Sequence, residues 1–174
     1  MGRDSAEPQN AQDAKLKAPV IFMLASRIMA LHKSDSSEQQ EAESYVLKAI
    51  EDKFDLCFNT NASLGIGVEP DGIDPEKRVV VEAYSHIGKL KGAQLHKVRA
   101  DILKLAFIEK KLGISWRKIM CFIDPEAASF LLGKSWAAEA ARSFNIEILV
   151  VKLTAEKEAL IKSAQKRQRM VNAP

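Results

Sequence analysis

Two mostly apolar runs, separated by a helical segment, constrain the fold of this chain more than any other feature. The runs cover residues 118–123 and 146–153, and helical spacing covers about 125–144 between them. A strand whose residues do not alternate with polar ones is typical of a sheet covered on both faces. A helix between two strands carries the chain back to the end of the sheet where the first strand began, so the second strand runs parallel to the first. The sequence therefore predicts an α/β domain.

The preceding part of the chain predicts an antiparallel hairpin. Apolar residues alternate with two glycines at 64–68, which indicates a strand. An acidic turn at 70–76 and a β-branched strand at 78–84 follow. Helices are expected at 38–54 and 94–111 from the spacing of their apolar residues. The predicted fold is α/β, with a mixed central sheet flanked by helices.

A chain of 174 residues has room for one domain with a sizeable core. Polar composition predicts a disordered or weakly helical leader, whereas the helical spacing of the next segment predicts an accessory helix. This accessory helix either docks on the domain or mediates a homodimer. The expected segments are the leader at 1–17, the accessory helix at 18–33, the α/β domain at 38–153 and a basic C-terminal helix or tail at 154–174.

Composition and targeting signals favour the cytoplasm and no membrane partner. Cys57 and Cys121 lack metal-ligand spacing and lie among apolar residues, which predicts buried thiols in a reducing compartment. The apolar stretch at 18–31 is interrupted by Arg27 and is too short to span a bilayer. A net charge of +3 permits a nucleic-acid partner without establishing one.

Three carboxylates are candidate metal ligands. Asp71 lies in the acidic turn, Glu82 lies on the strand that follows, and Glu43 lies on the core-facing stripe of the first helix. Hard cations such as Mg²⁺ bind carboxylate oxygens together with water and phosphate. Two alternatives stay open at this stage: a hairpin whose turn is acidic, and a Glu43 side chain that reaches solvent at the rim of the core.

This order of elements and acids resembles the PD-(D/E)xK superfamily of nucleases, which have the restriction-endonuclease-like fold. The resemblance covers roughly residues 38–153. It implies that Asp71 and Glu82 bind one or two Mg²⁺ or Mn²⁺ ions and that Glu43 completes the site. It also implies metal-dependent hydrolysis of phosphodiester bonds, with DNA as the expected partner.

The chain departs from the family motif at one position. The family has a lysine two residues after the second acid, and this chain has Tyr84 there. Lysines that could replace it are Lys89 and Lys91 in the next loop and Lys97 on the next helix, with Lys97 ranked first. Gln94 is similar to the glutamine that helps to position the site in the RecB-like branch of the family.

Two other functions remain in view. The first is a catalytically inactive nuclease-fold module that binds nucleic acid or protein through basic residues such as Lys97, Arg99 and Lys104. The second is an enzyme of unrelated chemistry centred on Asp124, although this residue is expected to cap the following helix. His86 is a candidate substrate contact near the proposed site.

Overall fold

The computed structural model describes residues 40–59 and 63–171, without the side chains of the last four. The expected leader and accessory helix, and with them the expected homodimer contact, lie outside the described residues. A single helix covers residues 40–54 at the start of the described part.

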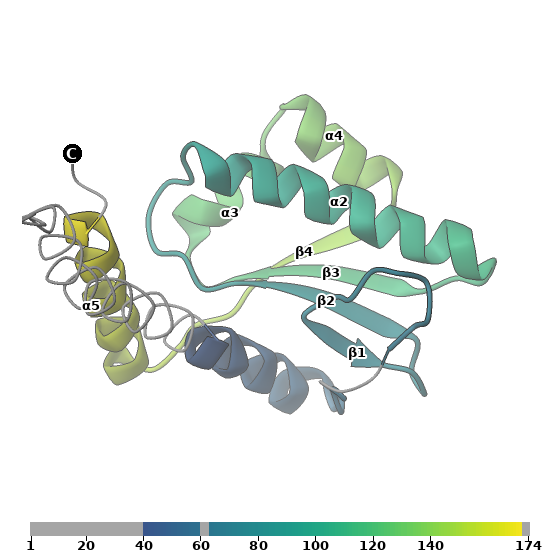
Figure 1. Cartoon of the computed structure of the whole chain (residues 1–174), viewed down its shortest axis with the longest axis horizontal. Helices are drawn as coiled ribbons and strands as arrows, with labels where there is room; N and C mark the ends of the chain where they lie inside the picture. Colours follow the sequence, from purple (N-terminus) through teal and green to yellow (C-terminus); the bar gives the residue numbers. More distant parts are fainter. Residues whose placement is uncertain (1–39, 60–62, 172–174) are drawn as a thin grey trace, which may run out of the picture. The chain divides into compact units, whose positions relative to one another are not determined.

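Four strands form one mixed sheet in the order β1-β2-β3-β4 (Figure 1). β1 pairs antiparallel with β2, whereas β2 with β3 and β3 with β4 pair in parallel. The mixed sheet that the sequence predicts is therefore confirmed. The strands are β1 (Gly72–Asp74), β2 (Val79–Tyr84), β3 (Arg117–Phe122) and β4 (Ile146–Val150).

The remaining helices are α2 (Ala93–Leu112), α3 (Pro125–Leu132), α4 (Trp136–Ser143) and α5 (Ala155–Val171). α2 ends at Gly113, which has a left-handed conformation with φ of 68°. The single helix expected at about 125–144 is divided into α3 and α4. The division occurs because Ser135 caps a new helix, where its hydroxyl accepts a hydrogen bond from the Ala138 N–H.

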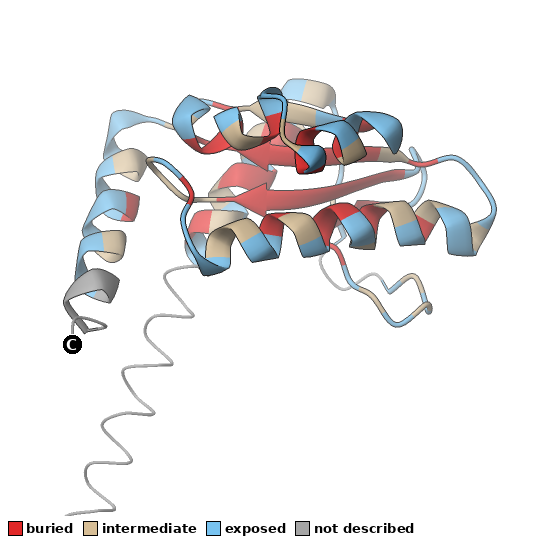
Figure 2. Cartoon of the chain, turned by 90° about the horizontal axis from the view of Figure 1, so that it is seen from above, coloured by how far each residue is buried: buried red, intermediate tan, exposed pale blue. Residues whose placement is uncertain are grey.

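The sheet separates two apolar cores. α2, α3 and α4 cover one face, and helix 40–54 covers the other (Figure 1). On β2, Val80 and Tyr84 belong to the core under α2, whereas Val81 and Ala83 belong to the second core. This alternation places Glu82 on the α2 face. Figure 2 shows that buried positions follow the strands and the sides of the helices that face them.

The sequence predicts a strand at 64–68, and this prediction is wrong. This segment forms a bend, because Gly65 and Gly67 have φ angles of 66° and 80°, which an extended strand does not contain. The first strand of the hairpin is instead β1, which lies within the segment expected to be the acidic turn. The hairpin itself is present, with its turn between Asp74 and Val79.

Two further findings concern the expected location of the protein. Cys121 is buried as expected, but Cys57 is exposed, so the prediction that both thiols are buried is wrong. None of the helices in the described part of the chain is both long and apolar enough to cross a membrane.

Close packing at Gly72 makes the hairpin sensitive to added volume. A Cβ atom at this position would lie 2.9 Å from Leu47 Cδ2 and 3.1 Å from Phe58 Cγ. We expect Gly72→Ala to lower the free energy of unfolding by about 1–3 kcal/mol, measured by urea denaturation, because one of these side chains must shift. Gly133→Ala is the control, since its nearest atom would lie 3.5 Å away. Equal midpoints for the two variants would contradict this account.

Candidate active site

The hairpin brings Asp71 beside Glu82. Gly72 pairs with Val81, so one further step along the antiparallel register places Asp71 opposite Glu82. The Ala83 N–H donates a hydrogen bond of 2.8 Å to Asp71 Oδ2, which fixes the Asp71 carboxylate at the edge of the sheet. The two acids named by the sequence therefore lie together.

Glu82 is a buried carboxylate whose charge is only partly balanced. Its side chain is 0% exposed, and its Oε1 lies 2.8 Å from Lys104 Nζ. No hydrogen-bond donor among the described residues reaches Oε2. Burial and then the nearby negative charges of Asp71 and Asp101 raise the pKa of Glu82 to about 8, against the opposing effect of Lys104. Glu82 is therefore a group that exchanges a proton near neutral pH.

Asp101 organises the donors around this carboxylate. The residue is 4% exposed, and its Oδ2 accepts a hydrogen bond of 2.6 Å from the Tyr84 hydroxyl. Lys97 Nζ lies 3.0 Å from Oδ2, and Lys104 Nζ lies 3.2 Å from Oδ1. One buried carboxylate on α2 therefore holds the strand tyrosine and two ammonium groups. We call Asp71, Glu82, Tyr84, Lys97, Asp101 and Lys104 the acid-lysine cluster.

Tyr84, two residues after Glu82 on β2, is a buried and closely packed residue. Its ring stacks on the Phe122 ring, with the two centroids 4.6 Å apart. Lys97 Nζ lies 4.8 Å from the centroid of the Tyr84 ring. Burial and the neighbouring Asp101 carboxylate raise the pKa of Tyr84, so its hydroxyl stays protonated and donates. Tyr84 therefore contributes a hydrogen bond to the acid-lysine cluster and no charge.

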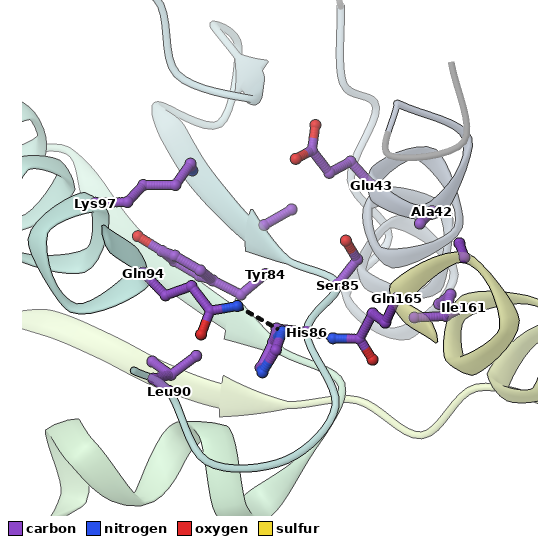
Figure 3. Close-up of a pocket in the computed structure, with 12 residues that line it drawn as sticks. Ala42, Glu43, Tyr84, Ser85, His86, Leu90, Gln94, Lys97, Ile161 and Gln165 are labelled. Carbon is purple, nitrogen blue, oxygen red and sulfur yellow. Dashed lines mark hydrogen bonds between the residues drawn. The ribbon is translucent and has the colours of Figure 1, made fainter. Parts of the chain in front are cut away.

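A pocket of about 190 Å³ lies at the end of β2, next to the acid-lysine cluster (Figure 3). Helix 40–54, the β2–α2 loop, α2 and α5 all contribute to it. We call it the end pocket. Its polar lining comes from Glu43, Ser85, His86, Gln94, Lys97 and Gln165.

The His86 ring is held by two amides inside this pocket. The Lys91 N–H donates to Gln94 Oε1 at 3.0 Å, so the Gln94 amide nitrogen faces His86 and donates to Nδ1 at 2.8 Å. The Gln165 amide nitrogen donates to the same Nδ1. Nδ1 therefore accepts, and the ring proton of neutral His86 lies on Nε2.

The predicted site residues lie in two adjoining places. Asp71 and Glu82 lie in the acid-lysine cluster, Glu43 and Gln94 line the end pocket, and Lys97 belongs to both. Three or more His, Cys, Asp or Glu side chains arranged to hold a metal ion do not occur in the described residues. Glu43 thus does not join the two acids in one such ligand group.

Lys89 and Asp124, two further candidates from the sequence, lie outside the acid-lysine cluster. Lys89 is exposed on the loop after β2, beside Leu90 of the end pocket. Asp124 accepts hydrogen bonds of 2.7 Å from the N–H groups of Gly88 and Glu126. Its carboxylate caps α3, as the sequence predicts.

Sequence reasoning missed Asp101 and the role of Lys104. Lys97, Asp101 and Lys104 have the i, i+4 and i+7 spacing that places side chains on one face of a helix. Their stripe adjoins the buried Val98 and Ile102, which turn α2 toward the sheet. The signal in the sequence is the alternation of basic and acidic residues beside a buried stripe of α2.

Asp71 and Glu82 are two neighbouring carboxylates, the donor type that a divalent cation such as Mg²⁺ takes from proteins. Mg²⁺ is usually held by one or two carboxylates and otherwise by water and substrate phosphate, so it does not require a third protein ligand. The lack of a donor at Glu82 Oε2 and the partial exposure of Asp71 are consistent with this chemistry.

Comparisons with known proteins provide no relatives. No family model, no curated protein and no solved structure matches this chain.

The raised pKa of Glu82 predicts a pH-dependent stability. The folded chain holds this proton more tightly than the unfolded chain, where the pKa is 4.5, so stability falls as pH rises from about 4.5 to about 8. We expect Glu82→Gln to lack this loss, which is on the order of a few kcal/mol. Urea denaturation of both proteins across this window measures the difference, because all other groups are shared. Parallel pH profiles would contradict the assignment.

The partners of Asp101 predict a large cost for removing its charge. Asp101→Asn leaves two ammonium groups without their shared buried carboxylate, and we expect a loss of about 3–5 kcal/mol in the free energy of unfolding. Asp52→Asn is the control, because Asp52 and Lys48 form a 3.2 Å pair with side chains 67% and 65% exposed. That variant should lose less than about 1 kcal/mol. Similar losses measured by denaturation would refute the organising role of Asp101.

Proposed function

We propose that this protein is a metal-dependent nuclease that hydrolyses phosphodiester bonds of DNA, with a restriction-endonuclease-like core. The observation that carries the proposal is the position of Lys104 Nζ, 2.8 Å from Glu82 on the strand that faces Asp71. Two acids and an ammonium group are the components that the PD-(D/E)xK resemblance requires. Here the ammonium comes from α2 rather than from β2.

The proposed roles follow from charge and exposure. Asp71 and Glu82 would hold Mg²⁺ or Mn²⁺, which when bound polarises a phosphoryl oxygen and lowers the pKa of a bound water. Lys104 limits the negative charge around Glu82. Lys97 has a side chain that is 44% exposed and lines the end pocket, so its ammonium can contact a substrate phosphate.

Asp101 and Tyr84 would position the two lysines and would take no part in the reaction themselves. Asp101 restrains both lysines, and Tyr84 restrains Asp101 through its hydroxyl. Lysines held before substrate arrives need no reorganisation when negative charge develops on the phosphoryl group, which is a general source of rate enhancement.

Exposed basic residues next to the end pocket support DNA as the substrate. Lys89 and Lys91 are exposed on the loop that flanks the end pocket, and Lys166 and Arg167 are exposed beside Gln165 on α5. Such groups would contact the phosphate backbone, so DNA affinity would fall steeply as salt concentration rises.

Calorimetric titration and DNA cleavage with matched variants test the proposal. We expect Mn²⁺ to bind wild type at neutral pH and to release protons, because a bound cation displaces the Glu82 proton. Glu82→Ala should lose both binding and cleavage. Lys104→Met should keep Mn²⁺ binding but reduce cleavage by about 100-fold, because it removes the ammonium group that limits the negative charge around Glu82 as charge develops in the transition state.

The control is Lys111→Met, an exposed lysine in the last turn of α2. This variant should bind Mn²⁺ and cleave DNA like wild type. A wild-type protein that takes up no cation would remove the basis of the proposal, and equal cleavage by the Lys104→Met and Lys111→Met variants would remove the role of Lys104.

A second candidate function is a catalytically inactive module that uses the same surface to bind nucleic acid or protein. The observation that favours it is the mutual pairing of Asp101 with Tyr84, Lys97 and Lys104, which satisfies these groups without a ligand. In the experiment above, DNA binding without cation uptake or cleavage is the result that supports this candidate.

A further inference from the structure

We infer that the end pocket binds a single unpaired nucleotide of the DNA strand that enters the acid-lysine cluster. The inference rests on the proposed function and deepens it, because it specifies the substrate as DNA with an unpaired nucleotide rather than a continuous duplex.

The pocket and the cluster share two residues. Tyr84 and Lys97 line the pocket and also belong to the cluster, and Tyr84 is two residues beyond Glu82 on β2. A rise of about 3.3 Å per strand residue puts this wall about 7 Å from Glu82, which is roughly the reach of one nucleotide along an extended strand. A nucleotide in the pocket would therefore neighbour a phosphate at the cluster.

The charge of the lining favours a neutral ligand group over a phosphate. Glu43 contributes a carboxylate and Lys97 an ammonium, and both are directed toward the space at the end of β2 (Figure 3). The Lys97 ammonium is paired with Asp101, which does not line the pocket, so a phosphate in the pocket would meet the Glu43 carboxylate. A base or sugar carries no such penalty.

The neutral lining matches the chemistry of a nucleobase. Gln94, Gln165 and His86 form a polar wall from the β2–α2 loop, α2 and α5, and Ser85 adds a hydroxyl (Figure 3). Amide groups both donate and accept, as base edges do. Apolar side chains complete the pocket and would contact the flat faces of a base: Ala42, Leu90, Ile161 and Ala164.

The size of the pocket excludes paired bases. A volume of about 190 Å³ is below the roughly 300–1,000 Å³ of sites for drug-sized ligands, so one base or sugar fills it. A longer stacked single strand is also disfavoured, because the two rings that line the pocket are already engaged: Tyr84 packs against Phe122 and Lys97, and His86 is hydrogen-bonded to Gln94. Both limits favour one nucleotide removed from a duplex end, overhang or bulge.

Fluorescence anisotropy in EDTA tests this inference separately from cleavage. The probes are a blunt DNA hairpin and the same hairpin with one unpaired nucleotide at its 3′ or 5′ end. We expect wild type to bind the probe with the unpaired nucleotide about tenfold more tightly than the blunt hairpin. Ala164→Leu fills the pocket, and Gln165→Leu removes an amide from its wall, so each should reduce the preference to less than about twofold.

The control is Ala159→Leu, because Ala159 is exposed on the same helix and does not line the pocket. This variant should keep the wild-type preference, and thermal melting should confirm that all three variants are folded. An equal affinity of wild type for the two probes, or a preference that survives both pocket variants, would overturn the inference.

The outcomes also distinguish the two proposals. Cleavage with cation but without a preference for unpaired nucleotides leaves the nuclease proposal and removes the pocket inference. A pocket-dependent preference without cleavage or cation binding supports the pocket within the inactive module. Failure to bind either probe rejects the pocket as a DNA-binding site.

Discussion

The carboxylate of Asp101 is the interaction on which the site depends. A buried charge is costly unless several donors satisfy it, and Asp101 has three: the Tyr84 hydroxyl and the ammonium groups of Lys97 and Lys104. The hydrogen bond to Tyr84 also links α2 to β2, in addition to their apolar packing. The lysines therefore depend on how α2 is rotated over the sheet, and that rotation follows from the buried residues Val98, Ile102 and Leu105. Core packing and the arrangement of charge in the site are consequences of the same helix orientation.

The balance of charges explains why this site responds to protons and would respond to cations. Three carboxylates (Asp71, Glu82 and Asp101) face two ammonium groups, so full ionisation would leave one negative charge in excess. The buried Glu82 takes up this imbalance as a raised pKa. A proton and a divalent cation would then compete for the same oxygens, because each relieves the same excess charge. The proposed metal chemistry and the pH-dependent stability thus have one electrostatic origin.

The sequence predicted the elements whose signals are local and failed where backbone conformation decided the outcome. Helices such as α2 and buried strands such as β3 were found because apolar spacing reports directly on the faces they bury. The expected strand at 64–68 had the right alternation, but its glycines have left-handed conformations that side-chain patterns do not reveal. The proximity of Asp71 to Glu82 was nevertheless predicted, since any short hairpin between them brings its two ends together. Its register, which makes the two residues direct neighbours, came only from the structure.

Lys104 escaped prediction for a different physical reason. The PD-(D/E)xK motif, which the sequence only resembles, places its lysine two residues after the acid because alternate residues of a strand share a face. An ammonium group that comes from α2 has no fixed sequence distance from Glu82, and only the packing of helix on sheet brings them together. Tyr84 is compatible with this arrangement because its hydroxyl binds Asp101 without adding charge. A third ammonium in its place would remove the excess negative charge around Glu82. Tyr84, Lys97 and Lys104 therefore form one arrangement around Asp101, in which both ammonium groups come from α2 and the strand contributes a hydroxyl.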